Sequence, residues 1–232
     1  MRLSILIFDG LTSLDAIGGY EVLSRIPGVE VEFFARRKEI VAADTRRLGL
    51  LAYRDFDEVQ STDILYVPGG PGATPLERDV EHLAKIRALD ATSTWTVGIC
   101  NGVGLLGAAG LLRGHAATTN WFYQDRLAGY GAKFVPERFH RSGKYVTGAG
   151  VSASIDTALF LTSLLAGEQI AKIIQLGVEY YPAPPFPERT PAEAPEDAKQ
   201  LVSTFEKEGG PALLRLTAPF AGLVPIRSSA AA

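Results

Sequence analysis

The chain of 232 residues has few of the residues on which many structural and functional sites depend. A single cysteine excludes an intramolecular disulfide framework and any zinc site built on paired cysteines. The three histidines, His82, His115 and His140, are scattered, so there is no HExxH motif and no close ligand pair. The longest apolar stretches, such as Val103–Leu112, are far shorter than the ~20 residues that cross a bilayer. These scarcities argue against a disulfide-rich, zinc-binding or membrane-spanning protein.

An excess of charge of one sign is also lacking. The 23 basic and 26 acidic side chains leave a net charge of −3, which offers no global electrostatic case for nucleic-acid binding. Hydrophobic residues make up 47% of the chain and charged residues 21%, as in an average globular protein and unlike a disordered one. The first apolar run meets Asp9 at once and lacks the longer apolar region of a secretory signal, so we expect a cytoplasmic protein.

Predicted strands and helices alternate along most of the chain. This alternation predicts an α/β fold with a mainly parallel sheet covered on both faces. In such sheets the chemistry lies outside the carboxyl ends of the strands, here the turns after Phe8, Val67, Ile99 and Thr147. The predicted strands are 3–8, 29–35, 63–67, 94–99, 116–119, 133–135, 139–140 and 145–147, with a short hairpin from 40–41 and 48–53. The predicted helices are about 13–25 (capped by Ser13), 75–90, 101–112, 121–129, 152–166, 168–180 and 195–208.

The composition changes at Pro182, where six prolines fall within sixteen residues. Such a segment is neither a helix interior nor a central strand. We expect an extended arm along the surface or along a partner subunit, followed by a helical tail with a frayed end. At this length one large domain is the default, since single cores stop growing near ~250–300 residues.

The strongest local signal is the run from Gly98 to Gly102, a G-x-C-x-G with Cys100 at its centre. It is the cysteine version of a nucleophile elbow, in which a strand turns sharply into a helix with the nucleophile at the apex. The residues before it favour a strand and those after it favour a helix. The thiol at the apex would then lie at the N-terminus of that helix, where the positive end of the helix dipole stabilises the thiolate form. The alternative is a small buried hydrophobe, the commonest role of a lone cysteine. The flanking glycines favour the nucleophile.

Two further features are expected at the same edge of the sheet. A glycine-rich loop, Pro68-Gly69-Gly70-Pro71-Gly72, follows a buried strand and lets backbone N–H groups approach a small ligand, as an oxyanion hole requires. It lacks the Lys and Ser/Thr of a phosphate-binding loop. Asp15 stands just inside the first predicted helix, and Glu21 competes with it for the role of acid.

One motif is rejected. Gly148 to Ala153 fits the pattern G-x-G-x-x-A between a strand and a helix, as in dinucleotide-binding folds. Such a fold would need a further strand to complete its βαβ unit, whereas only helices and the proline-rich arm are predicted to follow. We interpret the motif as a tight turn of small residues.

Taken together, the elbow, the loop YVPGGPG, the segment ATTNW and the turn TGAGVSASIDTALFL resemble the ThiJ/PfpI superfamily, which is related to class I glutamine amidotransferase domains. LDAIGGYEVL, AAGLLRGHAATT and QLGVEYYPAPPF are similar to bacterial isonitrile (isocyanide) hydratases. The resemblance covers about residues 3–187. It implies a single domain over 1–232 with a flavodoxin-like three-layer sandwich, with the arm and tail from about 182. It also implies a homodimer and no metal or organic cofactor.

In those hydratases the elbow cysteine attacks the isocyanide carbon, and a helix-one aspartate handles protons. The resemblance assigns these catalytic roles to Cys100 and Asp15, through a thioimidate that water converts to an N-substituted formamide. Backbone and amide groups are the candidates for binding the small-molecule substrate, with the backbone N–H groups of Asn101 and Gly70 facing a developing negative charge. The substrate-binding candidates are Gly69, Gly70, Asn101, Asn120 and Gly150.

Two positions depart from the hydratase pattern, which has threonine where this chain has Asn101 and histidine where it has Asn120. A Cys–His dyad at this position is therefore impossible, and acid–base work falls to a carboxylate or to water. The departures leave two alternatives open. One is another cysteine-dependent activity, glyoxalase-like or amidase-like. The other is a non-catalytic ligand-sensing domain like those on AraC-type regulators, although the chain has no helix-turn-helix extension or basic tail.

Overall fold

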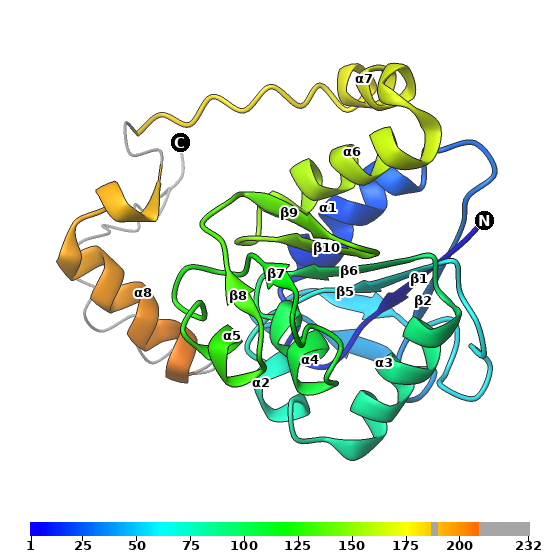
Figure 1. Cartoon of the computed structure of the whole chain (residues 1–232), viewed down its shortest axis with the longest axis horizontal. Helices are drawn as coiled ribbons and strands as arrows, with labels where there is room; N and C mark the ends of the chain where they lie inside the picture. Colours follow the sequence, from blue (N-terminus) through cyan, green and yellow to red (C-terminus); the bar gives the residue numbers. More distant parts are fainter. Residues whose placement is uncertain (187–189, 209–232) are drawn as a thin grey trace, which may run out of the picture.

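The computed structural model describes residues 1–186 and 190–208, and its centre is a six-stranded sheet with the order β2-β1-β5-β6-β10-β9 (Figure 1). Neighbouring strands are parallel except for the β10–β9 pair, which is antiparallel. The predicted mainly parallel sheet is thus confirmed. The strands are β1 (Arg2–Leu6), β2 (Glu30–Phe34), β5 (Ile64–Val67), β6 (Trp95–Ile99), β9 (Phe139–Ser142) and β10 (Tyr145–Gly148).

Helices cover both faces of this sheet. On one face α1 (Ser13–Leu23) packs against α6 (Ala153–Ala166), which also contacts β9 and β10. On the other face α3 (Val80–Thr92) and α4 (Gly102–Ala108) contact β5. The short helices α2 (Ala73–Leu76) and α5 (Arg126–Gly129) lie beside α4 (Figure 1). This arrangement is the three-layer, flavodoxin-like sandwich expected from the sequence.

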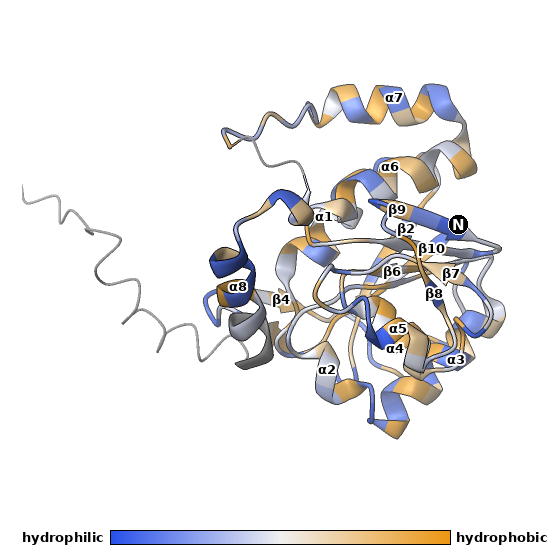
Figure 2. Ribbon diagram, turned by 60° about the vertical axis from the view of Figure 1, so that its left-hand side comes forward, coloured by the Kyte–Doolittle hydropathy of each residue, from blue (hydrophilic) through white to orange (hydrophobic). Residues whose placement is uncertain are grey.

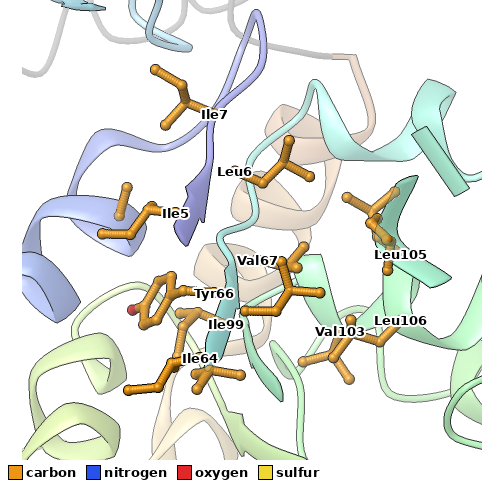
Figure 3. Packing of buried hydrophobic residues seen from close by; sticks show 14 of the residues in the cluster. Ile5, Leu6, Ile7, Ile64, Tyr66, Val67, Ile99, Val103, Leu105 and Leu106 are labelled. Atoms are coloured by element: carbon orange, nitrogen blue, oxygen red, sulfur yellow. The ribbon is translucent and has the colours of Figure 1, made fainter. Parts of the chain in front are cut away.

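The core lies on both sides of the central strands. Strands buried on both faces carry continuous apolar runs, and β5 has no exposed residue. Figure 3 shows Tyr66 and Ile99 grouped on one side of these strands, and Val67 toward Val103 of α4 on the other. Tyr66 is fully buried, and its hydroxyl donates to the main-chain oxygen of Asp15 in α1 at 2.7 Å. The core therefore connects β5 directly to the helix that carries the candidate acid.

Smaller elements surround the sandwich. β3 (Ile40–Ala42) and β4 (Gly49–Leu51) form the predicted antiparallel hairpin, and β7 (Ala116–Ala117) pairs in parallel with β8 (Lys133–Phe134). Helix α7 (Glu168–Gly177) packs on α6 and projects from the body of the fold (Figure 2).

The proline-rich arm follows α7. Residues 181–186 are extended and exposed, as predicted for the arm, and lead toward a 3₁₀ turn (Pro191–Glu193) and α8 (Glu196–Glu208). The rest of the predicted arm, at 187–189, and the predicted frayed end lie outside the described residues. The assignment of the whole chain to one domain stays a prediction.

Three predicted helices differ from the structure. The helix predicted over 75–90 is two helices, because Asp79 is extended and caps α3 by accepting from the N–H groups of Glu81 and His82. The helix predicted to reach residue 112 ends at Ala108, close to Gly110 with its φ of 82°. The helix predicted from residue 121 begins only at Arg126.

The predicted cap of the first helix is also different. Thr12 occupies the N-cap position of α1, and Ser13 is the first helical residue. The Thr12 hydroxyl hydrogen-bonds to Asp44 at 2.8 Å instead of capping the helix. None of the helices within the described residues combines the length and apolarity needed to cross a bilayer.

The Asp79 cap gives a pH-dependent prediction. Hydrogen bonds from His82 hold the pKa of the Asp79 carboxyl below its ordinary value. Its stabilising effect is therefore present above the unfolded-state pKa of about 3.9 and is lost as the pH falls through the lowered folded-state pKa. We expect Asp79→Ala to lower the free energy of unfolding by about 1 kcal/mol at pH 7. Asn is also a good cap, so Asp79→Asn should retain most of the stability while losing this acid dependence. Urea unfolding at pH 3 and pH 7 measures both, and equal losses for the two variants would contradict the assignment.

Candidate active site

Cys100 lies at the junction between β6 and α4, as the elbow motif predicts. Its φ is 56°, in the left-handed region that non-glycine residues rarely adopt. Its N–H donates to the Gly148 carbonyl oxygen at 3.1 Å, and its own carbonyl oxygen accepts from the Thr119 hydroxyl at 2.7 Å. The residue is 4% exposed. The elbow therefore presents a mostly buried thiol on a strained backbone that neighbouring segments hold from both sides.

The flanking glycines are required by close packing of the elbow against its neighbours. A Cβ on Gly98 would lie 2.8 Å from Leu106 of α4, and one on Gly102 would lie 2.4 Å from the carbonyl oxygen of Pro68. The glycines thus let α4 approach β6 and let the elbow approach the end of β5.

Asp15 is the acid that the fold brings to this edge. The residue is fully buried, and its Oδ2 accepts from the Gly69 N–H at 2.9 Å. The position of a Cβ on Gly69 lies 2.9 Å from Asp15 Oδ2 and also 2.9 Å from the backbone nitrogen of Asn101, the residue after Cys100. The carboxyl group and the elbow therefore converge on Gly69, where only a glycine leaves room for both.

Glu21, the competing acid, lies elsewhere. Its side chain is 47% exposed and pairs with Arg25 at 2.7 Å. The Tyr66 hydroxyl contacts the main chain of Asp15. Burial and the nearby Asp15 carboxyl raise the pKa of that hydroxyl well above its ordinary value. That hydroxyl therefore stays protonated and donates to the Asp15 main chain. The geometry favours Asp15 over Glu21 as the acid of the site.

The glycine-rich loop is clamped by Asn101. The Gly70 N–H donates to Asn101 Oδ1 at 2.6 Å, and Asn101 Nδ2 donates to the Gly70 carbonyl oxygen at 2.9 Å. The expectation that the Gly70 N–H faces a developing negative charge is therefore wrong for this structure, because that N–H is already donated within the protein. The N–H of Gly69 is likewise donated to Asp15. With an exposure of 2%, the Asn101 side chain is a structural clamp, and only its backbone N–H stays a predicted donor to substrate.

Asn120 contacts the thiol of Cys100 directly. Its Nδ2 donates to Cys100 Sγ at 3.2 Å, and its Oδ1 accepts from the Phe122 N–H at 3.4 Å. The second contact orients the amide so that its donor faces the sulfur. Hydrogen bonding to the charged form of a group favours that form, so this amide favours the thiolate. Sequence reasoning marked Asn120 only as a binding candidate in place of a histidine. It missed Thr119, its neighbour in the same segment.

Gly150 lies beside this amide, since a Cβ there would be 3.9 Å from Asn120 Nδ2. The rejected dinucleotide motif indeed lies between β10 and α6, and among the described residues no strand follows α6. Its first glycine, Gly148, instead accepts the N–H of Cys100. This turn is thus part of the elbow's support.

The three histidines have partners away from the elbow. The ring nitrogen Nδ1 of His82 bonds to Asp79, that of His115 to Ser142 and that of His140 to Glu137. Across residues 1–186 and 190–208, no three side chains of metal-binding type come close enough to hold an ion. The histidine rings are therefore engaged in contacts other than those described for Cys100.

Comparisons with known proteins agree with this geometry. The sequence pattern of the DJ-1/PfpI family matches residues 1–164. The chain belongs to the DJ-1/PfpI family. An isonitrile hydratase from Pseudomonas putida is 38% identical over 213 residues, which are 92% of this chain and 92% of that protein. The family membership implied by the motifs is thus confirmed.

Solved structures of other proteins share the fold. A ThiJ/PfpI family protein from Pseudomonas syringae is 31% identical, with a TM-score of 0.84 over 89% of this chain and 87% of its own. An AraC family transcriptional regulator from Pseudomonas putida is 19% identical, with a TM-score of 0.68 over 76% of this chain and 98% of its own. The second likeness concerns the fold alone.

The Asn120 contact gives a prediction for this DJ-1/PfpI site. A hydrogen bond to a charged group contributes about 1.5–3 kcal/mol, and 1.36 kcal/mol corresponds to one pKa unit. We therefore expect Asn120→Ala to raise the apparent pKa of the Cys100 thiol by about one unit or more. Asn120→Asp should raise it further, because it puts a carboxylate against the sulfur. The rate of iodoacetamide alkylation as a function of pH measures the shift. Gln124→Ala, at an exposed position of the same segment, is the control, and an unchanged profile in Asn120→Ala would contradict the role of the amide.

Proposed function

We propose that this protein is a cysteine-dependent hydro-lyase that converts an isonitrile and water to an N-substituted formamide. The observation that carries the proposal is the convergence of the Asp15 carboxyl group and the Cys100 elbow on Gly69. The similarity to the isonitrile hydratase from Pseudomonas putida over most of both chains supports the choice of substrate class. An isonitrile is nearly apolar and carries an electrophilic terminal carbon, so a mostly buried thiolate can attack it without a charged clamp.

The first step joins substrate and enzyme. The thiolate sulfur of Cys100 forms a bond to the terminal carbon of the isonitrile, and the same carbon takes a proton from the Asp15 carboxyl group. The product is a thioimidate, in which the former isonitrile carbon is bonded to sulfur and hydrogen and doubly bonded to nitrogen. A thiolate and a carboxylate at close range do not both ionise at low cost, so the two groups share one proton before substrate arrives.

The second step releases the product. Asp15, now a carboxylate, accepts a proton from a water molecule whose oxygen attacks the thioimidate carbon, acting as a general base. The imidate nitrogen takes this proton back from Asp15, which gives a tetrahedral intermediate. The carbon–sulfur bond then breaks, its electron pair returns to Cys100, and the remaining proton on the former water oxygen passes to the Asp15 carboxylate. The water oxygen becomes the carbonyl oxygen of the formamide. One water is consumed for each isonitrile, and the shared proton of the pair is restored.

The neutral amide of Asn120 has a defined part in both steps. It donates to sulfur in the resting thiolate and again when the thiolate leaves, without itself gaining or losing a proton. The backbone N–H of Asn101 is the second donor we assign to the site, with Gly69 and Gly150 bordering the substrate. Two contacts hold the glycine loop in place. Asn101 clamps Gly70, and the Gly69 N–H donates to Asp15.

The proposal is tested by incubating the purified protein with several alkyl and aryl isonitriles and following the formamide by chromatography. Cys100→Ala removes the attacking sulfur and should abolish turnover. Asp15→Asn keeps the shape of the side chain but removes the shared proton, and should reduce kcat by at least about 10²-fold. Glu21→Gln, at the exposed acid of the same helix, should leave the rate unchanged. Formation of lactate from methylglyoxal, or release of ammonia from small amides, without any formamide from isonitriles would contradict the proposal. Either result would indicate a glyoxalase-like or an amidase-like activity instead.

We further infer that the protein acts as a homodimer. In the single chain, apolar side chains along α7 and the arm are exposed to solvent: Ile173 is 54% exposed, Leu176 65% and Phe186 75%. Contact with a second copy would remove this surface from water. The absence of nucleic-acid partners and the cytoplasmic location stay predictions from the sequence.

Sedimentation equilibrium tests the oligomeric state. We expect a mass twice the 24.9 kDa of the chain. Leu176→Glu places a charge among the exposed apolar side chains of α7, so its mass should shift toward that of the monomer. Glu168→Gln, on the same helix, is the control. A concentration-independent mass of 24.9 kDa for the unaltered protein would contradict the dimer.

A further inference from the structure

We propose that Glu77 is a positioning residue, which holds the segment 120–130 so that the amide of Asn120 stays against Cys100 Sγ. The inference rests on the proposed role of Cys100 as nucleophile, and it assigns a function to a buried charged cluster that the reaction steps do not use. The cluster comprises Glu77, Arg126, Tyr130, Thr74 and Tyr123, and it is called the α2–α5 clasp below.

Glu77 is a buried acid at the point where three elements meet. Its side chain is only 5% exposed, and it follows α2, the helix after the glycine-rich loop. Its Oε2 pairs with Arg126 at 2.8 Å and accepts from the Tyr130 hydroxyl at 2.7 Å, both in the region of α5. Its Oε1 lies against α4, since a Cβ on Gly104 would be 2.4 Å away. Burying a carboxylate costs free energy unless the group is paired and hydrogen-bonded, so Glu77 depends on its contacts with Arg126 and Tyr130.

The clasp has a second, parallel contact. The Thr74 hydroxyl and the Tyr123 hydroxyl are 2.9 Å apart, and the Arg126 guanidinium lies 5.2 Å from the centre of the Tyr123 ring. Burial and Glu77 raise the pKa of the Tyr130 hydroxyl to about 12. Tyr130 therefore remains a donor to Glu77 throughout the neutral range.

Successive turns connect the clasp to the nucleophile. The Arg126 N–H donates to the Tyr123 carbonyl oxygen at 3.0 Å, and the Tyr123 N–H donates to the Asn120 carbonyl oxygen at 2.9 Å. Directly before this segment, the Thr119 hydroxyl donates to the Cys100 carbonyl oxygen. The segment is therefore held at both ends, and the 3.2 Å contact from Asn120 to sulfur lies between the two anchors.

A direct electrostatic effect of Glu77 on the thiol would have the opposite sign. Glu77 and Arg126 carry opposite charges, so replacing the carboxylate with an amide leaves a net positive charge nearby, which favours the thiolate. If Glu77 instead acts through Asn120, its replacement loosens the donor to sulfur and disfavours the thiolate. The other ionisable groups on the elements around the elbow, the Asp15 carboxyl of α1 and the Tyr66 hydroxyl of β5, are unchanged in this comparison.

The experiment is the pH dependence of iodoacetamide alkylation of Cys100 in Glu77→Gln, Asn120→Ala and the double variant. We expect Glu77→Gln to raise the apparent pKa of the thiol and to slow alkylation at pH 7 by about three- to tenfold. It should add nothing in the Asn120→Ala background, since the two residues act in series. Glu168→Gln, an exposed and ion-paired glutamate on α7, is the matched control.

Gly104→Ala is a second variant that keeps every charge of the clasp. Its added methyl group would displace the Glu77 carboxylate, so the alkylation profile should shift in the same direction. Thermal unfolding at neutral pH verifies that each variant is folded. A lowered thiol pKa in Glu77→Gln, an unshifted profile, or a shift that adds fully to that of Asn120→Ala would each overturn the proposal. Because alkylation needs no isonitrile, these results stay independent of whether the proposed substrate is turned over.

Discussion

The left-handed backbone of Cys100 is the constraint on which the rest of the site depends. Such a conformation costs a non-glycine residue of the order of 1–3 kcal/mol, and it persists only where the surrounding structure holds it. Here the N–H of Cys100 is held by β10, its carbonyl oxygen by Thr119, and the following turn by close contact of Gly102 with the end of β5. The strain is local, whereas the contacts that maintain it come from distant segments.

The same contacts surround the sulfur with buried polar side chains. Asp15, Asn101 and Asn120 are polar side chains with exposures of 0%, 2% and 6%, and each makes a hydrogen bond at the elbow or the glycine loop. In a site of low polarity, hydrogen bonds and charges act more strongly than in water. A donor such as Asn120 therefore acts on the thiolate more strongly there than in water, and the role we propose for Glu77 is to hold that donor in place.

The departures of this chain from the hydratase pattern acquire a physical meaning in the structure. Asn101 makes two hydrogen bonds to Gly70, so it fastens the elbow to the glycine loop. Asn120 supplies a donor to sulfur that does not titrate, and the carboxyl group that the fold places at the elbow is that of Asp15. The absence of histidine from this position is therefore compatible with a cysteine nucleophile.

The sequence by itself determined the sandwich and the position of the elbow, because these follow from patterns within short stretches. Buried strands are apolar runs, and glycines two residues on either side of the cysteine mark the elbow between strand and helix. It did not determine that α2 and α3 are separate helices, that Asn101 occupies the Gly70 N–H, or that Asn120 faces the sulfur. Those pairings join residues 31 and 20 positions apart, and the Asp15–Gly69 bond joins residues 54 apart. Only tertiary packing decides them, since no local periodicity records which buried donor meets which acceptor.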